Sequence, residues 1–462
     1  MREFELVIDE ALKAGLSPKL TTPSNSQLLY ECLGFRCGKL GLGPYKELTN
    51  PLPALFSIEY NWPYPQFLVD ETYNILVVRD LINMEDVIYT VSDDHATVTQ
   101  IAVCDQLTYG SLGTQVELAD FGEYAVMVNG VVIVSWDPTL SVWVTTVATA
   151  TMPLMRTICN FKGQAVGGNV EGVWHDCDDT FYIWSKIGSI DFTPERGNTA
   201  GYRRCPYGGV VHNVRRLGDV VAGYSSEGVT FLVPVKEPAV TFGFVEKEDT
   251  GIINKGAVNG SLDHQVYVGT DHIIREVTSQ GVKELGYQYL MKQLTAGDII
   301  VQYEHSKKNY FFSDGEKTFM LSPQGMTESP QHPSAVWRKG DDAYMLPGSV
   351  GAYDPMIAGQ PVDMGYRGQK TTFEMETDAN DYTDGEVTVD YLDESQAWNT
   401  HTYTPLNNQS LGSVIASGNA FRLRLKFGSI DSDFRISYLR ARYKMTDLRG
   451  IRGVYAPPPR GQ

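Results

Sequence analysis

The residue types that bind metals or carry acid–base chemistry are spread along the chain without the spacing such chemistry needs. The eight histidines form no HxxxH or HxH pair, and no glycine-rich run follows a strand to open a helix as a phosphate loop does. The six cysteines contain no CxxC pair, and Cys32 and Cys37 are the only close couple. Such thiols are expected to be reduced and partly buried, the alternatives being a Cys32–Cys37 disulfide or a metal site. The sequence therefore predicts no catalytic residues, no metal and no cofactor.

Three acidic segments resemble functional loops but depart from them at the deciding positions. Asp378 to Glu386 (DANDYTDGE) resembles a calcium loop, yet Gly385 is out of place and Thr383 stands where the loop needs glycine, so a solvated acidic turn is expected. Ser313 to Phe319 (SDGEKTF) and Ser226 to Phe231 (SEGVTF) resemble the Asp-box of sialidases without its Ser-x-Asp-x-Gly spacing. Glycosidases need two carboxylates across a cleft, and no arginine triad with a Tyr–Glu couple accompanies these segments. The chain is therefore expected not to be an enzyme, and a glycosidase remains the alternative.

Charge is distributed unevenly along the chain. The whole chain carries −18, but from Phe421 to Arg460 ten Lys and Arg stand against three Asp, which makes that segment +7 and the remainder −25. In Phe421 to Phe427 (FRLRLKF) the odd positions are apolar and the even ones basic, as in a strand with one face in a core. An acidic body with a basic end favours head-to-tail docking of subunits, and solvated strand faces are the alternative. The residues expected at a subunit interface are Arg422, Arg424, Lys426, Arg435, Arg440 and Arg442.

A second basic group lies in a long insertion between Asp191 and His212, which is rich in Gly, Arg and Tyr. Its Arg196, Arg203 and Arg204 are expected on a contact loop or a channel loop, and a merely mobile loop is the alternative.

Nothing in the chain directs it to a membrane. The first residues, MREFELVIDEALKAG, are acidic where a signal peptide is basic and then apolar. The longest apolar stretch, Tyr124 to Trp136, is split by Asn129-Gly130 and is too short to span a bilayer. Neither export nor membrane insertion is expected.

The elements that must carry these residues are β-hairpins, which recur along most of the chain. Each has a polar entry, alternating β-formers, a tight turn and more β-formers, and Asn129-Gly130 and Asp314-Gly315 supply the positive φ of primed turns. The turn centres at residues 93, 129, 186, 227, 270, 314 and 348 are 36, 57, 41, 43, 44 and 34 residues apart. A period of about 40–45 residues is typical of a four-stranded propeller blade. A β-propeller is expected, and a large sandwich or a pair of β-domains without radial order is the alternative.

Four regions are expected, and the fold class is all-β. Residues 1–60 form an extended N-terminal arm in which Glu3 to Ala14 is a candidate amphipathic helix, and residues 61–356 form the β-propeller-like domain. Longer strands between residues 357 and 446 form a small C-terminal β-sandwich, and residues 447–462 form an extended Pro-rich tail.

The order of these features resembles one known family. Thr180 to Tyr202 (TFYIWSKIGSIDFTPERGNTAGY), Val210 to Val235 (VVHNVRRLGDVVAGYSSEGVTFLVPV) and Gly251 to Val258 (GIINKGAV) lie inside the hairpin repeats, and FRLRLKF and FRISYLRARYK close the chain. This pattern, over residues 110 to 445, is similar to the tail-nozzle family of short-tailed bacteriophages, also called packaged-DNA-stabilisation or tail-completion proteins. The resemblance implies consecutive propeller strands at Trp184, Phe192, Pro194, Gly218, Asp219 and Val229 to Val233.

The resemblance also implies a structural function. A protein of this family forms a ring, expected to be a hexamer, below the portal and its adaptor in the virion tail, and is assembled in the cytoplasm of the host bacterium. It continues the DNA channel, helps to retain the packaged double-stranded DNA, and carries tail fibre, spike or needle proteins. An acidic channel wall repels phosphate, so DNA is expected to pass without tight binding. The alternatives are a tail fibre or receptor-binding propeller that reads host glycans and a sialidase-like glycosidase.

Overall fold

The structure is a computed structural model that divides into two compact units. It describes residues 3–19, 29–53, 66–69, 74–80, 85–105, 117–122, 124–128, 132–137, 142–147, 152–171, 174–235, 241–339, 341–346, 353–363 and 369–446. The propeller unit comprises Leu48–Thr318 and Gln331–Ser349. The sandwich unit comprises Met1–Glu47, Phe319–Pro330 and Val350–Gln462.

Five four-stranded sheets follow one another along the described part of the propeller unit, and in each the strands pair in chain order. They consist of β5 (Gln66–Val69), β6 (Asn74–Asp80), β7 (Glu85–Val91) and β8 (Val98–Asp105); β9 (Glu117–Asp120), β10 (Tyr124–Val128), β11 (Val132–Asp137) and β12 (Val142–Val147); β13 (Leu154–Phe161), β14 (Gln164–Glu171), β15 (Phe181–Trp184) and β16 (Gly201–Arg204); β17 (Val211–Leu217), β18 (Val220–Ser225), β19 (Val229–Val235) and β20 (Thr241–Glu248); and β21 (Val258–Gly260), β22 (His264–Val268), β23 (Ile274–Thr278) and β24 (Gly281–Gly286).

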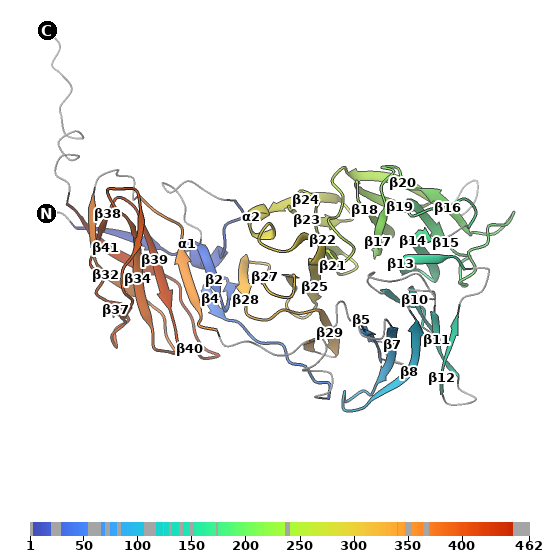
Figure 1. The fold of residues 1–462 in the computed structure, drawn as a ribbon, viewed down its shortest axis with the longest axis horizontal. Coiled ribbons are helices and arrows are strands. Elements are labelled where there is room, and N and C mark those ends of the chain that lie inside the picture. Colours follow the sequence, from blue (N-terminus) through green and yellow to red (C-terminus); the bar gives the residue numbers. More distant parts are fainter. Residues whose placement is uncertain are drawn as a thin grey trace, which may run out of the picture. The chain divides into compact units, whose positions relative to one another are not determined.

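Two further strand pairs complete the cycle. After the short helices α2 (Gln288–Met291) and η2 (Ala296–Asp298), β25 (Ile300–Glu304) pairs with β26 (Asn309–Ser313), and β29 (Ala335–Lys339) pairs with β30 (Asp342–Leu346). The first strands of these sheets contact one another in the order β5, β9, β13 and β17, then β21, β25 and β29, and β29 contacts β5. A hydrogen bond from Arg215 to Asn259 joins β17 to β21. This closed order of first strands is a β-propeller, and Figure 1 shows its sheets following the chain from blue to brown.

The cores of the propeller lie between neighbouring sheets. In β10 the buried Ala125 and Met127 pack with residues of the first sheet, whereas Val126 and Val128 pack with residues of the third. Because successive side chains of a strand point to opposite faces, a strand covered on both faces is apolar at every position. Further on, Trp184 packs in a cluster with Leu232 of the next sheet.

The sandwich unit contains two main sheets and both ends of the described chain. One consists of β1 (Glu3–Ile8), β41 (Leu439–Met445), β32 (Lys370–Thr377), β37 (Leu411–Gly412) and β38 (Ala416–Gly418); the other includes β28 (Met326–Ser329), β2 (Leu29–Leu33), β31 (Met356–Gly359), β39 (Phe421–Lys426), β34 (Glu386–Leu392), β35 (Trp398–Thr400) and β36 (Thr404–Pro405). The smaller elements are α1 (Glu10–Ala14), β3 (Phe35–Gly38), β4 (Gly41–Pro44), β33 (Tyr382–Thr383), β40 (Ser429–Ile430) and β27 (Thr318–Leu321), whose first residue ends the propeller unit.

The alternation of apolar and basic residues in FRLRLKF gives a strand with one buried face, as the sequence predicts. Phe421, Leu423 and Leu425 on β39 are fully buried, and the basic residues between them are partly exposed. At the end of the strand, Phe427 packs edge-on against Phe434 with ring centroids 5.1 Å apart. The expected strand with one face in a core is therefore confirmed.

The N-terminal region is built into the sandwich unit. Strand β1 pairs with β41 from Glu3↔Lys444 to Ile8↔Leu439, as the blue and red strands of Figure 1 show, and β2 lies between β28 and β31. The helix expected over Glu3 to Ala14 is wrong, because only Glu10–Ala14 is helical. The alternating residues of β1 extend a sheet instead, and the Asp9 carboxylate accepts the Glu10 N–H at the start of the helix.

The unit boundaries differ from the expected region boundaries at residues 60/61 and 356/357. Met1–Glu47 and Val350 onwards belong to one unit, together with Phe319–Pro330 from within the repeats. The tail at 447–462 lies outside the described residues.

The expected turns meet different outcomes. Asp314-Gly315 is a turn, with φ +90° at Gly315 and a hydrogen bond from Asp314 N to Lys317 O. Asn129-Gly130 lies outside the described residues, although β10 and β11 pair on either side of it.

The tight hairpin expected to turn at residue 186 is wrong. The chain after β15 forms a long loop closed by Lys186 and Asp191, whose side chains are 2.6 Å apart, and the partner strand β16 lies inside the presumed insertion. Strand β30 pairs with the preceding strand β29, and the turn expected at residue 348 lies outside the described residues.

Candidate functional site

The basic residues of β39 are paired within the chain. Asp390 on β34 stands opposite Arg422 and is 3% exposed. Its Oδ2 accepts a hydrogen bond of 2.8 Å from Arg424 Nε and lies 3.5 Å from Arg422 Nη1. Lys426 Nζ lies 2.6 Å from a carboxylate oxygen of Asp354, and this hydrogen bond raises the pKa of Lys426. These three cations therefore have carboxylate partners without a second subunit.

Arg422 is also held by two aromatic rings. Its guanidinium carbon lies 4.3 Å from the ring centroid of Tyr30 and 5.4 Å from that of Trp398. Both rings are partly exposed, so a cation between their faces gains electrostatic attraction while the rings cover its flat surfaces.

The basic residues of β41 have partners on both neighbouring strands. Arg442 lies 3.6 Å from Glu5 on β1 and 3.2 Å from Glu374 on β32. Arg440 lies 3.9 Å from Glu5 and 3.6 Å from Glu376. The acidic complement expected on a neighbouring subunit is therefore present within the chain, in part on the N-terminal strand.

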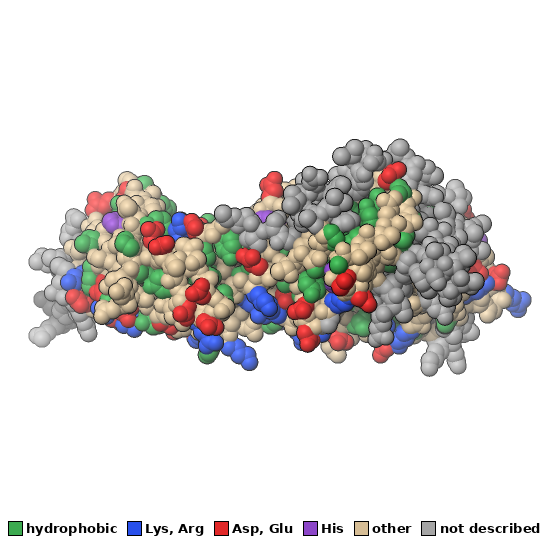
Figure 2. Space-filling model, turned by 90° about the horizontal axis from the view of Figure 1, so that it is seen from below, with side chains coloured by type: hydrophobic (Ala, Val, Ile, Leu, Met, Phe, Trp, Pro, Cys, Tyr) green, Lys and Arg blue, Asp and Glu red, His purple; other side chains and the backbone are tan. Residues whose placement is uncertain are grey.

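Arg435 is the exception in the expected interface group. Its side chain is exposed and forms no ion pair with any residue that the structure describes. Its backbone N–H donates to Asn380 Oδ1 at 2.8 Å, and its carbonyl accepts the Asn380 N–H at 3.3 Å. It borders a hollow of about 410 Å³ between the β3–β4 hairpin and residues 432–435. The interface role of all six residues remains a prediction. On the face shown in Figure 2, basic side chains lie among acidic ones.

The three arginines of the expected contact or channel loop lie at the rim of the propeller. Arg203 and Arg204 are on β16, the last strand of its sheet and the farthest in strand order from the innermost β13. Arg204 Nε donates to Thr180 Oγ1 at 3.1 Å, and the Arg203 guanidinium lies over the Phe244 ring. Arg196 is exposed in a turn before β16. The structure thus places Arg203 and Arg204 on the strand farthest from the propeller axis, with their side chains on opposite faces of the sheet.

Polar side chains link the innermost strands around that axis. The Thr157 hydroxyl on β13 accepts the Val214 N–H of β17 at 2.9 Å, and Asn259 on β21 donates to the Val301 carbonyl of β25 at 3.1 Å. Gln302 on β25 then donates to the Ser334 carbonyl, just before β29, at 2.9 Å. These bonds run from sheet to sheet in chain order, so they contribute to closing the cycle.

Glu117 on β9 is the centre of the most connected group at the axis. Its Oε2 accepts bonds from Thr157 Oγ1 at 2.7 Å and from Ile158 N at 3.0 Å. Its Oε1 accepts a bond from Asn213 Nδ2 at 2.8 Å and lies 3.8 Å from Lys255 Nζ. A buried carboxylate is stable only with such a set of donors. Glu117 therefore joins three sheets and the segment before β21.

A cavity of about 490 Å³ opens beside this group. It is lined by the ends of the innermost strands β9, β13, β17 and β21 and by residues that follow β21 and β25. His305 stands at its wall, and burial lowers the pKa of this imidazole. Burial also raises the pKa of the Cys159 thiol, another lining residue. We call this space the axial cavity.

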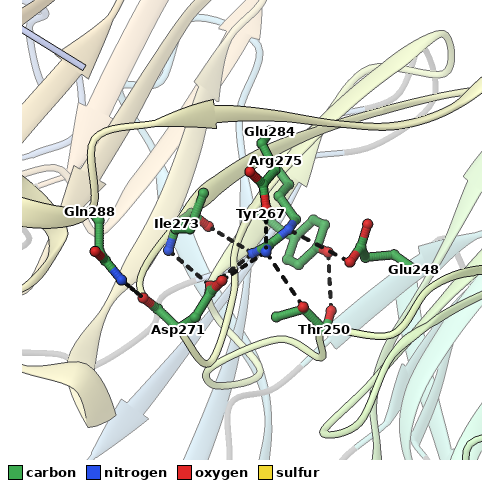
Figure 3. Close-up of polar contacts among 8 residues, drawn as sticks. All are labelled: Glu248, Thr250, Tyr267, Asp271, Ile273, Arg275, Glu284 and Gln288. Atoms are coloured by element: carbon green, nitrogen blue, oxygen red, sulfur yellow. Dashed lines mark hydrogen bonds and ion pairs between the residues drawn. The ribbon is translucent and has the colours of Figure 1, made fainter. Parts of the chain in front are cut away.

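A second buried polar group, around Arg275 on β23, ties the fifth sheet to the fourth (Figure 3). Arg275 is 2% exposed, and its Nη2 lies 2.7 Å from Asp271 and 3.0 Å from Glu284. The Arg275 Nε lies 4.0 Å from Glu248 at the end of β20. Burial raises the pKa of Asp271, but the hydrogen bonds from Arg275 and the Ile273 N–H, together with the Arg275 charge, leave that pKa below its ordinary value. The group is structural, because its charged side chains form ion pairs with one another.

Other candidate sites receive no support from the described residues. No group of three or more His, Cys, Asp or Glu there could hold a metal ion. Cys32, Cys37, Cys159, Cys177 and Cys205 are free thiols, and burial raises the pKa of Cys37 to about 12. No described helix is both long enough and apolar enough to cross a membrane.

The sequence reasoning missed the axial residues. Asn213, Asn259 and Gln302 are amide side chains at comparable places of successive first strands, 46 and 43 residues apart. That recurrence is the signal that could have found them. Glu117 has no such signal.

Comparison with known proteins assigns the chain to no family. No protein-family model matches the chain, and no curated protein matches it. Among solved structures, Hsv2 of Kluyvelomyces marxianus is similar with TM-score 0.33 and 9% identity, over 57% of this chain and 83% of that one. KlHsv2 with loop 6CD replaced by a Gly-Ser linker is similar with TM-score 0.35 and 10% identity, over 62% of this chain and 83% of that one. At this level neither likeness bears on function, and the propeller assignment rests on the strand order.

Proposed function

We propose that the protein is a structural component of a short-tailed bacteriophage tail, a nozzle-like ring that continues the DNA channel below the portal and adaptor. The location of the segments that resemble the nozzle family supports the proposal. Trp184 lies on β15, Gly218-Asp219 form the turn between β17 and β18, and Val229 to Val233 lie on β19. These are strands of two successive propeller sheets, whereas Phe192 and Pro194, which the resemblance also places on strands, lie in the loop after β15. In this role the ring helps to retain packaged DNA and carries receptor-binding appendages.

The assembly is tested on the purified full-length chain. Its mass by native mass spectrometry and its end-on image by electron microscopy are expected to give a closed ring of six copies. A closed ring needs heterologous interfaces, in which two different surfaces of each copy meet. A monomer at all concentrations, or a trimeric fibre, would contradict the nozzle proposal.

Arg435 offers the cleanest test of the expected basic interface, because its substitution breaks no described ion pair. We expect Arg435→Glu to weaken ring formation, and more so at low salt than at high salt, because screening already removes much of the attraction at high salt. Lys283→Glu is the matched control, since Lys283 is also exposed and forms no ion pair with a described residue. Equal assembly of both variants at both salt concentrations would place Arg435 outside the interface.

The ring is proposed to let double-stranded DNA pass without gripping it. The chain carries −18 overall, and net negative charge opposes adhesion of a polyanion. The isolated ring is therefore expected to bind duplex DNA only weakly in a filter or anisotropy assay. Tight, salt-sensitive binding that disappears when Arg196, Arg203 and Arg204 are neutralised would overturn this part of the proposal.

The nozzle function requires no catalysis. Incubation with a panel of sialosides and other glycosides is expected to release no product. Turnover that is lost on mutating a carboxylate would favour the glycosidase alternative.

A further inference from the structure

The turn at residues 92–97, which follows β7 in the first propeller sheet, is anchored on the last sheet by His95. This side chain is 4% exposed, and its Nε2 accepts a hydrogen bond of 3.3 Å from Nε1 of Trp337 on β29. The imidazole also packs against the ring of Tyr344 on β30, with ring centroids 5.1 Å apart. Strand β29 contacts β5 of the first sheet (Figure 1). His95 therefore joins the two ends of the propeller cycle.

The chain that precedes the first sheet joins the last sheet at the same place. The Met345 N–H on β30 donates to the Thr49 carbonyl at 3.1 Å, so residues 48–52 extend the last sheet. Leu52 from this segment lies in one apolar cluster with Trp337 and with residues of β6 and β7. We call the contact that the His95 turn and this segment make with β29 and β30 the closing seam.

The hydrogen bond between Trp337 and His95 requires a neutral imidazole. An indole N–H is a donor and never an acceptor, so His95 Nε2 must present its lone pair. An imidazolium carries a hydrogen on both ring nitrogens. Protonation of His95 therefore replaces the bond with a contact between two N–H groups, and it places a charge in a buried site.

The charged groups near His95 come from its own turn and from β29. Burial lowers the pKa of His95 and Lys339 on β29 lowers it further, whereas Asp94 and Asp93 raise it by less. The two carboxylates are exposed, and Asp93 Oδ1 already lies 3.4 Å from Lys339 Nζ. Strands β7 and β30 add tyrosines, which are uncharged at neutral and acid pH: Tyr89 and Tyr344. These surroundings keep the imidazole neutral while the seam is closed.

Opening of the seam therefore becomes easier as the pH falls. In an open seam His95 is hydrated and has its ordinary pKa of 6.5, whereas in the closed seam its pKa is lower. Below pH 6.5 the open form thus binds more protons than the closed form. The opening equilibrium then increases by up to about tenfold per pH unit, until the closed form is protonated as well. Above this range both forms are neutral and pH has no effect through His95.

We propose that the closing seam is an acid-sensitive switch, in which protonation of His95 releases its turn from Trp337 and separates the first propeller sheet from the last. Opening exposes the apolar cluster around Leu52 and Trp337 to solvent. The switch lies within the propeller unit of one chain, so it does not rest on the nozzle function or on ring formation.

The test is hydrogen–deuterium exchange of the full-length protein at pH 7.5 and pH 5.5, read by mass spectrometry of peptides and corrected for the intrinsic exchange rate. Peptides that contain residues 92–97, β29 and β30 are expected to exchange several-fold faster at pH 5.5, up to about tenfold. Peptides from β18 and β19, in the fourth sheet, are the internal reference and should keep their protection. Equal protection of the seam peptides at both pH values would overturn the proposal. The same acceleration in the reference peptides would overturn it too, because it would indicate general acid unfolding.

Two variants of His95 test the assignment to this side chain. His95→Gln retains an acceptor for the indole N–H but does not titrate, so its seam peptides are expected to exchange equally at both pH values. His95 has φ +60°, a conformation in which Asn is common, so His95→Asn is the second variant. Its side chain is too short to reach Trp337, and fast seam exchange at both pH values is expected.

His212→Gln is the matched control. His212 on β17 is partly buried and burial also lowers its pKa, but it lies in the fourth sheet, so the variant should retain the pH dependence of the wild-type seam. Thermal unfolding checks that each variant is folded. Seam exchange that still accelerates at pH 5.5 in either folded His95 variant would refute the role of His95.

Discussion

Glu5 and Arg442, from opposite ends of the chain, face each other across the β1–β41 strand pair, with Glu5 Oε1 3.6 Å from Arg442 Nε. Strand β1 thus supplies acidic partners to β41, which carries three basic side chains. Lys444 and Glu3 repeat the arrangement at 3.1 Å. The basic side chains of β41 therefore have acidic partners within the chain, and Arg435 is the residue of the expected interface group that forms no described ion pair.

We predict a small, salt-sensitive coupling between Glu5 and Arg442. Their side chains are 51% and 35% exposed, so the pair is expected to contribute about 0.2–1 kcal/mol to the free energy of unfolding. A double-mutant cycle with Glu5→Gln and Arg442→Gln, read by denaturant unfolding, measures it at low and high salt. Glu394→Gln replaces Glu5→Gln in the control cycle and should show no coupling. A coupling that grows with salt would contradict the electrostatic account.

Removing the Glu117 carboxylate should destabilise the propeller unit strongly. Glu117→Ala removes the acceptor of Thr157 Oγ1 and Ile158 N, one of the two acceptors of Asn213 Nδ2 and the carboxylate beside Lys255, and a loss of about 3 kcal/mol is expected. Denaturant unfolding measures the loss. The exposed Glu316, whose side chain makes no described contact, is the control, and Glu316→Ala should change stability by less than about 0.5 kcal/mol. Similar effects of both changes would show that the axial network is not needed for closure.

The buried Lys370 is predicted to increase the free energy of unfolding as the pH rises in alkaline solution. It is fully buried, its Nζ donates to the Asn419 carbonyl at 2.9 Å, and burial lowers its pKa from 10.5 to about 8. Between these two values the unfolded chain binds more protons at this residue than the folded chain, so this residue's contribution to the free energy of unfolding increases with pH. The increase can reach about 1.4 kcal/mol per pH unit.

The measurement compares denaturant unfolding of the wild type and Lys370→Met between pH 7 and pH 10. The difference in stability, wild type minus variant, is expected to increase with pH. Lys39→Met, at an exposed lysine, is the control and should give a difference that does not change with pH. A difference for Lys370→Met that stays constant over this range would mean that the buried amine keeps an ordinary pKa.

Two glycines allow the cost of backbone strain to be measured without any contribution from steric crowding. Neither Gly315 nor Gly297 has an atom within 4 Å of an added Cβ, but only Gly315 has a positive φ, of +90°. Gly315→Ala is expected to cost about 1–2 kcal/mol of unfolding free energy, because L residues disfavour this conformation. Gly297→Ala should be neutral or slightly stabilising. Equal thermal stabilities of the two variants would argue against a primed turn at Asp314-Gly315.

The local elements could be predicted from the sequence because their causes are local. Alternation at period two marks FRLRLKF as a strand with one buried face, and a positive-φ glycine marks the turn at Asp314-Gly315. The repeat of about 43 residues predicts sheets of similar size in succession, which the propeller unit contains. The tight turn expected at 186 failed because the partner strand β16 begins only at Gly201, and the alternation within β15 does not reveal the length of the loop that follows it.

The sequence by itself determined the all-β class, the recurring hairpins and the alternating faces, since these depend on residues close together in the chain. Only the tertiary structure decided that the first 47 residues join the C-terminal strands, that Glu5 meets Arg442, and that Glu117 gathers donors from three other segments. The pairing of distant strands depends on which edges and apolar faces remain uncovered once all local elements have formed. A carboxylate such as Glu117 becomes structural only when those pairings enclose it.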